Sequence, residues 1–389
     1  MKQTLNIGII GVGNIGSAHA AAIHDGRVQG MRLAALCDID EDRREVLHRA
    51  FPSIPLFSSH KKLLGSGLCD AVIIATPHYF HPTIAIDAFE KGLPVLTEKP
   101  AGVTCLDVRK MMCAAEKNKK IFAIMFNQRT NKLFRRAKAL VEGGELGELR
   151  RAVWIITNWY RKDCYYASGS WRATWDGEGG GVLLNQAPHN LDLLQWIVGM
   201  PQSVYAVCTE GKHHAIEVED DATLLMRYEN GAEAVFITST GEYPGTNRLE
   251  ITGTGGKLVI ENGVLTFTKN EIDERDFRRT AEPQKNPLTV SNEYDEKYNG
   301  HINILENFAR AVLDGEPLIA PGNEGIRELT LSNAAYLSAW LEHPVTLPMD
   351  DALYAEMLAK KAQSTSRTAD KEARESLQSS YKDRWNTSW

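Results

Sequence analysis

Residues 5–22 read LNIGIIGVGNIGSAHAAA, which is an apolar run, a group of spaced glycines and an alanine-rich segment in direct succession. The apolar run predicts a buried β-strand over residues 5–10, because it is short and rich in isoleucine. The alanine-rich segment predicts a helix over residues 17–24. The glycines therefore stand where a strand must turn sharply into a helix.

These glycines have the spacing G-x-G-x-x-G, which carries meaning only between a strand and a helix. Asp38 closes the next predicted strand, 22 residues after Gly16, where about 20 are expected in a dinucleotide-binding motif. The helix N-terminus would attract the pyrophosphate, and the Asp38 carboxylate would accept the ribose hydroxyls. Six residues are expected to contact the dinucleotide here: Gly11, Gly13, Asn14, Ile15, Gly16 and Asp38.

The carboxylate at position 38 also bears on which dinucleotide is bound. A carboxylate repels a 2′-phosphate, so the sequence favours NAD over NADP. Arg43 and Arg44 follow closely and keep NADP or dual use as an alternative, and Arg43 is included among the expected cofactor contacts.

The first 126 residues alternate short β-branched runs with segments of helix length. This pattern is typical of βαβ units and predicts an α/β domain with a doubly wound, parallel Rossmann sheet. The predicted strands are 5–10, 33–37, 71–76, 95–97 and 122–126.

From residue 150 the pattern changes to longer alternating segments, which predict a second α+β domain with a large, mostly antiparallel sheet. Its predicted helices are 181–198, 303–313 and 324–340, and residues 270–300 are expected to form a surface loop. We expect domains over 1–126 and 127–348, followed by a charged tail over 349–389. Beyond Lys360 the tail is expected to be a loose helix or partly disordered.

Composition narrows the class of protein. The 389 residues carry 44 Lys and Arg against 50 Asp and Glu, a net charge of −6, which lacks the basic surface that nucleic acid requires. No apolar run reaches the ~18 to 20 residues of a membrane span. Six scattered cysteines are typical of free thiols, so a cytoplasmic location is expected, with neither nucleic acid nor membrane as a partner.

Polar residues follow two of the predicted strands, at the edge where parallel sheets bind ligands. Thr76-Pro77, His78 and His81 follow one strand, and Glu98-Lys99-Pro100 follows another. Lys99 could direct its ammonium at a substrate oxygen, although a solvated loop lysine is the alternative. The cofactor contacts expected from these segments are Thr76, Pro77, His81, Glu98 and Lys99.

The densest polar and glycine signal is GGGVLLNQAPH at residues 179–189. On the predicted helix Asn185 and His189 are four residues apart and share a face, and Pro188 would kink it. A histidine is the natural group to take a proton from a hydroxyl, so His189 is a candidate base. The alternative is a core histidine paired with Asp192 or Asn185.

Several of these segments together resemble the family of glucose-fructose oxidoreductase, inositol dehydrogenase and MocA. The matching segments are GVGNIGSAH (11–19), DAVIIATPHYFH (70–81), LPVLTEKP (93–100), EGGGVLLNQAPHNLDLLQW (178–196), ENFARAVLDGEP (306–317) and NAAYLSAWLEHPVTLP (333–348). The resemblance implies that Lys99 and His189 line a sugar site, and that the chain forms a homodimer or homotetramer. The family commonly has Asp where this chain has Asn185, so no carboxylate at that position can assist His189.

Residues 154–175 mix tryptophan and tyrosine with arginine. Sugar and cyclitol rings present C–H faces to aromatic rings and hydroxyl edges to polar groups, so this mixture suits a polyol pocket. A sheet core or a subunit interface would use the same aromatics. The expected substrate contacts are Lys99, Asn127, Trp159, Arg161, Trp171, Arg172, Asn185 and His189.

We therefore expect an NAD(P)-dependent dehydrogenase that oxidises a secondary hydroxyl of a sugar, glycoside or cyclitol, or runs the reverse. His189 would take the proton, Lys99 would stabilise the alkoxide and Asn185 would orient the ring. No metal is expected, because the histidines and cysteines lack zinc-site spacing. The alternatives are glycoside cleavage through a keto intermediate without net redox, and a non-catalytic sensor.

Overall fold

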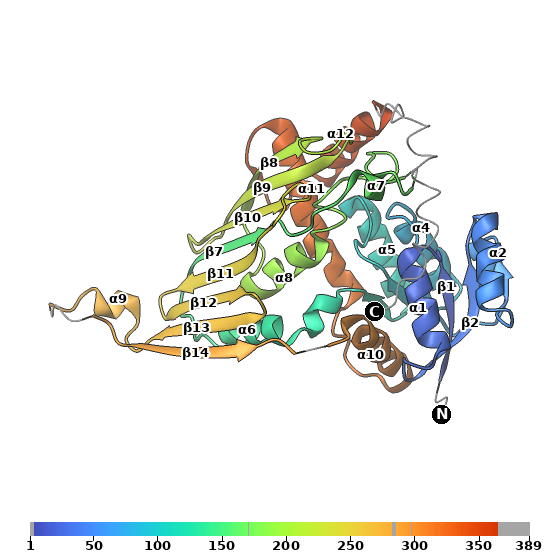
Figure 1. Cartoon of the computed structure of the whole chain (residues 1–389), viewed down its shortest axis with the longest axis horizontal. Helices are drawn as coiled ribbons and strands as arrows, with labels where there is room; N and C mark the ends of the chain where they lie inside the picture. Colours follow the sequence, from blue (N-terminus) through green and yellow to red (C-terminus); the bar gives the residue numbers. More distant parts are fainter. Residues whose placement is uncertain (1–3, 170, 282–284, 297, 365–389) are drawn as a thin grey trace.

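The structure is a computed structural model that describes residues 4–169, 171–281, 285–296 and 298–364 (Figure 1). Its N-terminal part contains a six-stranded sheet in which all paired strands are parallel, and the rest is built on a nine-stranded, mostly antiparallel sheet. The predicted α/β class with a Rossmann sheet and a second α+β domain is confirmed.

The parallel sheet has the strand order β3-β2-β1-β4-β5-β6. Its order reverses between β1 and β4, and the loops that follow these two strands flank the crevice where such sheets bind ligands. Its strands are β1 (Leu5–Ile10), β2 (Met31–Cys37), β3 (Leu56–Phe57), β4 (Ala71–Ile74), β5 (Val95–Thr97) and β6 (Phe122–Ile124). The helices between them are α1 (Asn14–His24), α2 (Glu41–Ala50), α3 (His60–Leu64), α4 (Phe80–Glu90) and α5 (Cys105–Lys117).

The turn from β1 into α1 needs two of its glycines. Gly11 has φ +84°, and a Cβ there would lie 2.7 Å from the backbone carbon of Ala75. A Cβ on Gly16 would lie 2.1 Å from the carbonyl oxygen of Gly11. The loop after β1 therefore lies directly against the loop after β4.

The chain leaves the first sheet through η1 (Asn127–Thr130) and α6 (Lys132–Glu142) and enters the second sheet, whose order is β14-β13-β12-β11-β7-β10-β9-β8-β15. β7 and β10 are parallel, and the other named pairs are antiparallel. The strands are β7 (Leu149–Ile156), β8 (Ser203–Glu210), β9 (Glu219–Arg227), β10 (Glu233–Ser239), β11 (Asn247–Gly253), β12 (Gly256–Glu261), β13 (Val264–Asn270), β14 (Leu288–Tyr294) and β15 (Val345–Thr346).

One face of this sheet is covered by helices α6, α8 and α11, which lie between it and the parallel sheet (Figure 1). Asn333 of α11 joins the two parts of the chain, because its amide bonds the backbone of Cys105 and Val103 at 3.1 and 3.0 Å. Glu306 of α10 accepts the backbone N–H of Gln29. The remaining helices are α7 (Asp163–Tyr166), α8 (Pro188–Val198), α9 (Glu274–Phe277), α10 (Gly300–Asp314), η2 (Gly322–Glu324), α11 (Gly325–Leu341) and α12 (Asp351–Gln363).

The prediction of one helix over 181–198 is wrong. Helix α8 begins at Pro188, which occupies the first turn and causes no kink. The buried Glu219 carboxylate accepts the backbone N–H groups of Gly181 and Leu183, both at 2.9 Å. These bonds tie the start of the segment to β9. Residues 181–187 form turns, which include backbone bonds from Asn185 to Gly181 and from Gln186 to Val182, and the helix begins only at Pro188.

The prediction of a surface loop over 270–300 is also wrong, because the segment contains α9 and the edge strand β14. Most of the β14 side chains are exposed, and charged segments flank its short alternation of apolar and polar residues, so the segment was interpreted as a loop.

Part of the expected tail is ordered as α12, which buries Tyr354 and Leu358 and stacks Tyr354 on Trp340 at 5.6 Å between ring centres. Asp350 caps this helix, because its side chain accepts the N–H groups of Ala352 and Leu353. The expectation for residues 365–389 lies outside the described residues. None of the helices in the described ranges has the length and apolarity needed to span a lipid bilayer.

Candidate active site

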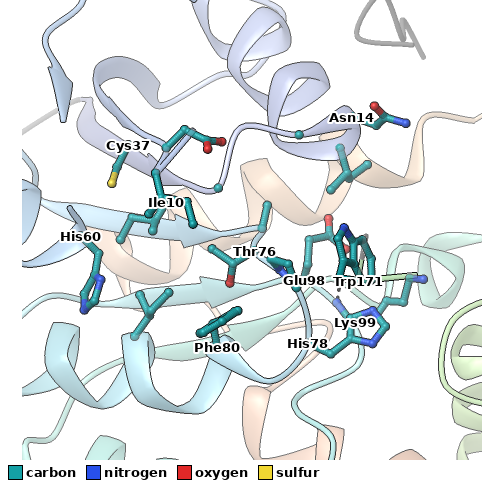
Figure 2. Close-up of a pocket in the computed structure, with 18 of the residues that line it drawn as sticks. Ile10, Asn14, Cys37, His60, Thr76, His78, Phe80, Glu98, Lys99 and Trp171 are labelled. Carbon is teal, nitrogen blue, oxygen red and sulfur yellow. Dashed lines mark hydrogen bonds between the residues drawn. The ribbon is translucent and has the colours of Figure 1, made fainter. Parts of the chain in front are cut away.

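A cavity of about 610 Å³ lies at the carboxyl ends of β1, β4 and β5, where the second domain meets the parallel sheet. Figure 2 shows Cys37 and His60 at one end of it and Glu98, Lys99 and Trp171 at the other. We call the first the nucleotide end and the second the reaction end.

The glycine loop and Asp38 form the wall of the nucleotide end, together with Asn14 and Ile15. A Cβ on Gly13 would have no neighbour within 4 Å, so the backbone there is open to a ligand. Asp38 is held in place because its Oδ2 accepts the N–H of Val12 at 2.8 Å and its Oδ1 accepts that of Asp40 at 3.1 Å. Gly11 also lines the cavity, whereas Gly16 supports the turn from behind.

Arg43 does not line the cavity, contrary to the expectation that it contacts the cofactor. Its buried guanidinium donates to the carbonyl oxygen of Val12 at 2.5 Å and also contacts the Ser17 hydroxyl. Arg43 therefore supports the glycine loop from the side away from the ligand. Arg44 donates to the carbonyl oxygens of Asp38 and Ile39, at 3.0 and 2.8 Å.

Thr76 and Pro77 line the middle of the cavity. The Thr76 hydroxyl is buried and has no hydrogen-bond partner within the described ranges. His81 lies behind them, fully buried, with its ring nitrogens 2.7 Å from the carbonyl oxygen of Thr76 and 2.8 Å from that of Pro100. Burial lowers the pKa of His81. This histidine joins the two loops and does not reach the cavity.

Lys99 and Glu98 follow β5 and line the reaction end. Lys99 Nζ donates a 2.7 Å hydrogen bond to the backbone carbonyl oxygen of Asn185. Burial lowers the pKa of Lys99, and the carboxylates of Glu98 and Glu328 oppose that effect. Burial alone would raise the pKa of Glu98, but His19, 2.7 Å away, lowers it to about 2. The site thus contains an ammonium beside an ionised carboxylate.

His189 is the second residue of α8 and lines the same end. Burial, and to a smaller extent the charge of Lys99, lowers the pKa of His189 to about 3. Its Nδ1 is buried with no hydrogen-bond partner among the described residues, and the Phe126 ring lies 6.4 Å away edge-on. His189 is therefore a neutral imidazole at physiological pH and can accept a proton.

Asn185 lines the cavity from the turn before α8, so it reaches the site without sharing a helical face with His189. Its amide nitrogen donates to the Tyr165 hydroxyl at 3.1 Å and to the carboxylate of Glu178. Glu178 is buried, which raises its pKa, and the nearby guanidinium of Arg172 opposes that rise. Neither Glu178 nor Tyr165 is among the expected site residues, although Tyr165 belongs to the aromatic segment 154–175 and Glu178 opens the segment 178–196.

His301, from the first turn of α10, also lines the reaction end and is absent from the expected site. Burial lowers its pKa to about 4. Asn127 lies behind it, with Nδ2 3.3 Å from His301 Nδ1, and does not line the cavity. Only the packing of α10 brings His301 here, and no motif in the sequence marks it.

Of the expected aromatic and arginine contacts, Trp171 and Arg172 line the cavity. The guanidinium of Arg172 lies 4.5 Å from the Trp171 ring and donates to the Tyr165 hydroxyl at 2.8 Å. Trp159 and Arg161 are not among the lining residues, and Arg161 lies over the outer side of the same cluster, 5.0 Å from the Tyr165 ring. His78, which follows β4, completes this wall and packs against Trp171 (Figure 2).

The residues present fit a dinucleotide. The open backbone at Gly13, the fixed carboxylate of Asp38 and the unpartnered Thr76 hydroxyl line one cavity, where Gly13 would face the pyrophosphate and Asp38 the ribose hydroxyls. No group of three or more His, Cys, Asp or Glu side chains that could hold a metal ion occurs in the described part of the chain.

Two family models match the chain. The model described as an oxidoreductase family with an NAD-binding Rossmann fold matches residues 5–126, and the GFO/IDH/MocA C-terminal domain matches residues 134–259. Together they cover more than half of the chain.

Individual relatives agree with these models. The rhizopine catabolism protein MocA of Rhizobium meliloti is 28% identical, with 85% of this chain and 93% of the relative covered. The myo-inositol 2-dehydrogenase of Thermotoga maritima is 25% identical, with 90% and 100% covered. The crystal structure of the WlbA dehydrogenase from Bordetella pertussis with NADH and UDP-GlcNAcA is 26% identical, with 89% and 100% covered and a TM-score of 0.75. The chain belongs to the Gfo/Idh/MocA family of NAD-binding oxidoreductases.

Proposed function

We propose that the protein is a dehydrogenase that oxidises a secondary hydroxyl of a sugar, glycoside or cyclitol to a ketone, or runs the reverse reaction, with NAD as its cofactor. The observation that carries the proposal is the pairing of Lys99 and His189 at one end of the cavity whose other end holds the glycine loop and Asp38. A regulatory dinucleotide-binding protein would need neither group. The similarity to a myo-inositol 2-dehydrogenase and to a WlbA dehydrogenase bound to UDP-GlcNAcA supports a polyol or sugar substrate.

The chemistry divides between the chain and its cofactor. NAD, when bound, supplies the acceptor for a hydride at its nicotinamide ring. His189, neutral at physiological pH, takes the proton of the reacting hydroxyl. The Lys99 ammonium stabilises the negative charge that develops on the same oxygen. The bond from Lys99 to the Asn185 carbonyl keeps the ammonium in position before substrate arrives.

The preference for NAD rests on Asp38. Its carboxylate is fixed by two backbone N–H groups at the nucleotide end, where it would accept the ribose hydroxyls and repel a 2′-phosphate. Arg43 and Arg44 are both engaged with the protein itself, which supports NAD over NADP.

We further propose a homodimer or homotetramer that uses the face of the second sheet not covered by α6, α8 and α11. Tyr205 and Val207 of β8 and Val290 of β14 are exposed there, at 40, 56 and 58%. Light scattering on a sizing column tests this, since a monomer at micromolar concentration would contradict it.

The function is tested by absorbance at 340 nm with NAD and NADP separately, across inositols, hexoses, anhydrosugars and aryl glycosides. Wild type is compared with His189→Ala. Formation of NADH that the variant loses would support the dehydrogenase and define its substrate. Release of aglycone without NADH would replace it by glycoside cleavage, and silence in both assays despite NAD binding would favour a sensor.

A further inference from the structure

The Asn185 side chain has its two amide protons already used. Nδ2 donates to the Tyr165 hydroxyl and to the Glu178 carboxylate. Its Oδ1 accepts no hydrogen bond within the described ranges, although Asn185 lines the cavity. The side chain therefore offers a ligand an acceptor and no donor.

This orientation depends on Glu178, which is 2% exposed. The N–H of Ala173 donates to its Oε2 at 2.6 Å, and the Arg172 guanidinium lies 3.8 Å from its Oε1. These groups oppose the rise in the Glu178 pKa caused by burial and favour the ionised carboxylate, which only accepts hydrogen bonds, so the amide nitrogen of Asn185 faces it. The Tyr165 hydroxyl accepts from the Arg172 guanidinium at 2.8 Å and also lies 3.2 Å from Gln186 Nε2, so Glu178 is the contact that fixes the Asn185 amide.

We propose that Glu178 is a positioning residue for substrate recognition: it fixes the Asn185 amide so that Oδ1 accepts a hydrogen bond from a hydroxyl of the polyol beside Lys99. The family commonly has a carboxylate at position 185. In this chain the carboxylate belongs to Glu178 and acts on the substrate through the Asn185 amide. The inference rests on the proposed function, because the polyol is the ligand that donates to Oδ1.

Exchanging the two groups tests the proposal. Asn185→Asp places two carboxylates within hydrogen-bonding distance, where like charges oppose each other. We expect kcat/KM for the polyol to fall by about 30-fold or more, mainly through KM. Adding Glu178→Gln restores one amide and one carboxylate with the roles reversed, and leaves an acceptor facing the substrate. The double variant is expected to recover at least about 10-fold over Asn185→Asp.

Glu219 provides the matched control. It is also a buried carboxylate that holds the same turn, through Gly181 and Leu183, but it does not contact the Asn185 side chain. Glu219→Gln added to Asn185→Asp is expected to give no recovery. The midpoint of urea unfolding and the NADH fluorescence of each variant show that it is folded and binds cofactor.

The proposal is supported if adding Glu178→Gln to Asn185→Asp restores kcat/KM and adding Glu219→Gln does not. Recovery in both double variants would overturn it. So would a folded Asn185→Asp/Glu178→Gln double variant whose loss of kcat/KM is the product of the two single losses. A wild type that turns over no polyol in the 340 nm screen is a separate result, because it would remove the proposed function itself.

Discussion

Lys99 Nζ is bonded at 2.7 Å to the backbone carbonyl oxygen of Asn185, so the end of a Rossmann strand is joined directly to the turn before α8 in the other domain. Because the acceptor belongs to the main chain, a change of the side chain at position 185 leaves this bond in place. The position of the ammonium is set by the backbone of the turn, which Glu219 in turn holds through two N–H groups. The Lys99 ammonium thus comes from the Rossmann domain, and the His189 imidazole that accepts the proton comes from the second domain.

The first prediction concerns Lys99. Lys99→Met keeps the length of the side chain and removes its charge. We expect kcat to fall by about 100- to 1,000-fold, the usual loss for one electrostatic stabiliser of a developing oxyanion. The dissociation constant of NADH, measured by fluorescence, is expected to change only a few-fold. The exposed Lys91→Met is the matched control, and a Lys99→Met variant within three-fold of it would contradict the assignment.

The second prediction concerns pH. The folded pKa of His189 is about 3, well below its ordinary value, so the proton-accepting form persists as the pH falls through 6.5. We expect kcat/KM for oxidation to show no acid limb near pH 6.5. On the alkaline side the lowered pKa of Lys99 sets the limit. As the pH rises, the ammonium loses its proton, and we expect activity to fall, at a pH lower than the ordinary lysine pKa of 10.5. An acid limb near pH 6.5 in the profile would contradict a base with the lowered pKa of His189.

Local patterns account for much of the site, and long-range packing accounts for the rest. The glycine loop, Asp38 and Lys99 were predictable because each lies just after a strand, and the edge of a parallel sheet brings strand ends together. His301 was not predictable, because only the packing of α10 brings it to the cavity.

The segment 181–198 shows how a local pattern is overridden. Its composition favours a helix throughout, but residues 181–187 form turns, and Glu219, 36 to 38 residues away, ties them to β9 through the N–H groups of Gly181 and Leu183. A bond between distant elements carries no mark in the sequence near the turn. For the same reason the role of Glu178 beside Asn185 became visible only in the folded chain.

The third prediction concerns cofactor choice. Asp38→Ser removes the carboxylate that repels a 2′-phosphate, so we expect KM for NAD to rise about 10-fold and the preference for NAD over NADP to shrink by a larger factor. Asp40→Ser is the control, because Asp40 caps α2 through the N–H of Arg43 and does not line the cavity. Steady-state kinetics with both cofactors decide the matter. An unchanged ratio in Asp38→Ser would place the determinant elsewhere.

The last prediction concerns the buried ion pair that joins η1 to α8. Arg129 is 1% exposed and donates to both carboxylate oxygens of Asp192, at 2.8 and 2.6 Å, and to Glu324 at 2.5 Å. Arg129→Met leaves Asp192 buried with Gln195 as its one side-chain donor among the described residues, so we expect the free energy of unfolding to fall by about 3 to 5 kcal/mol. Adding Asp192→Leu removes the stranded charge and is expected to recover part of the loss, measured by urea unfolding at pH 7.5. A loss of unfolding free energy below about 1 kcal/mol in Arg129→Met would contradict this prediction. It would mean that the Asp192 carboxylate is not desolvated in the folded state.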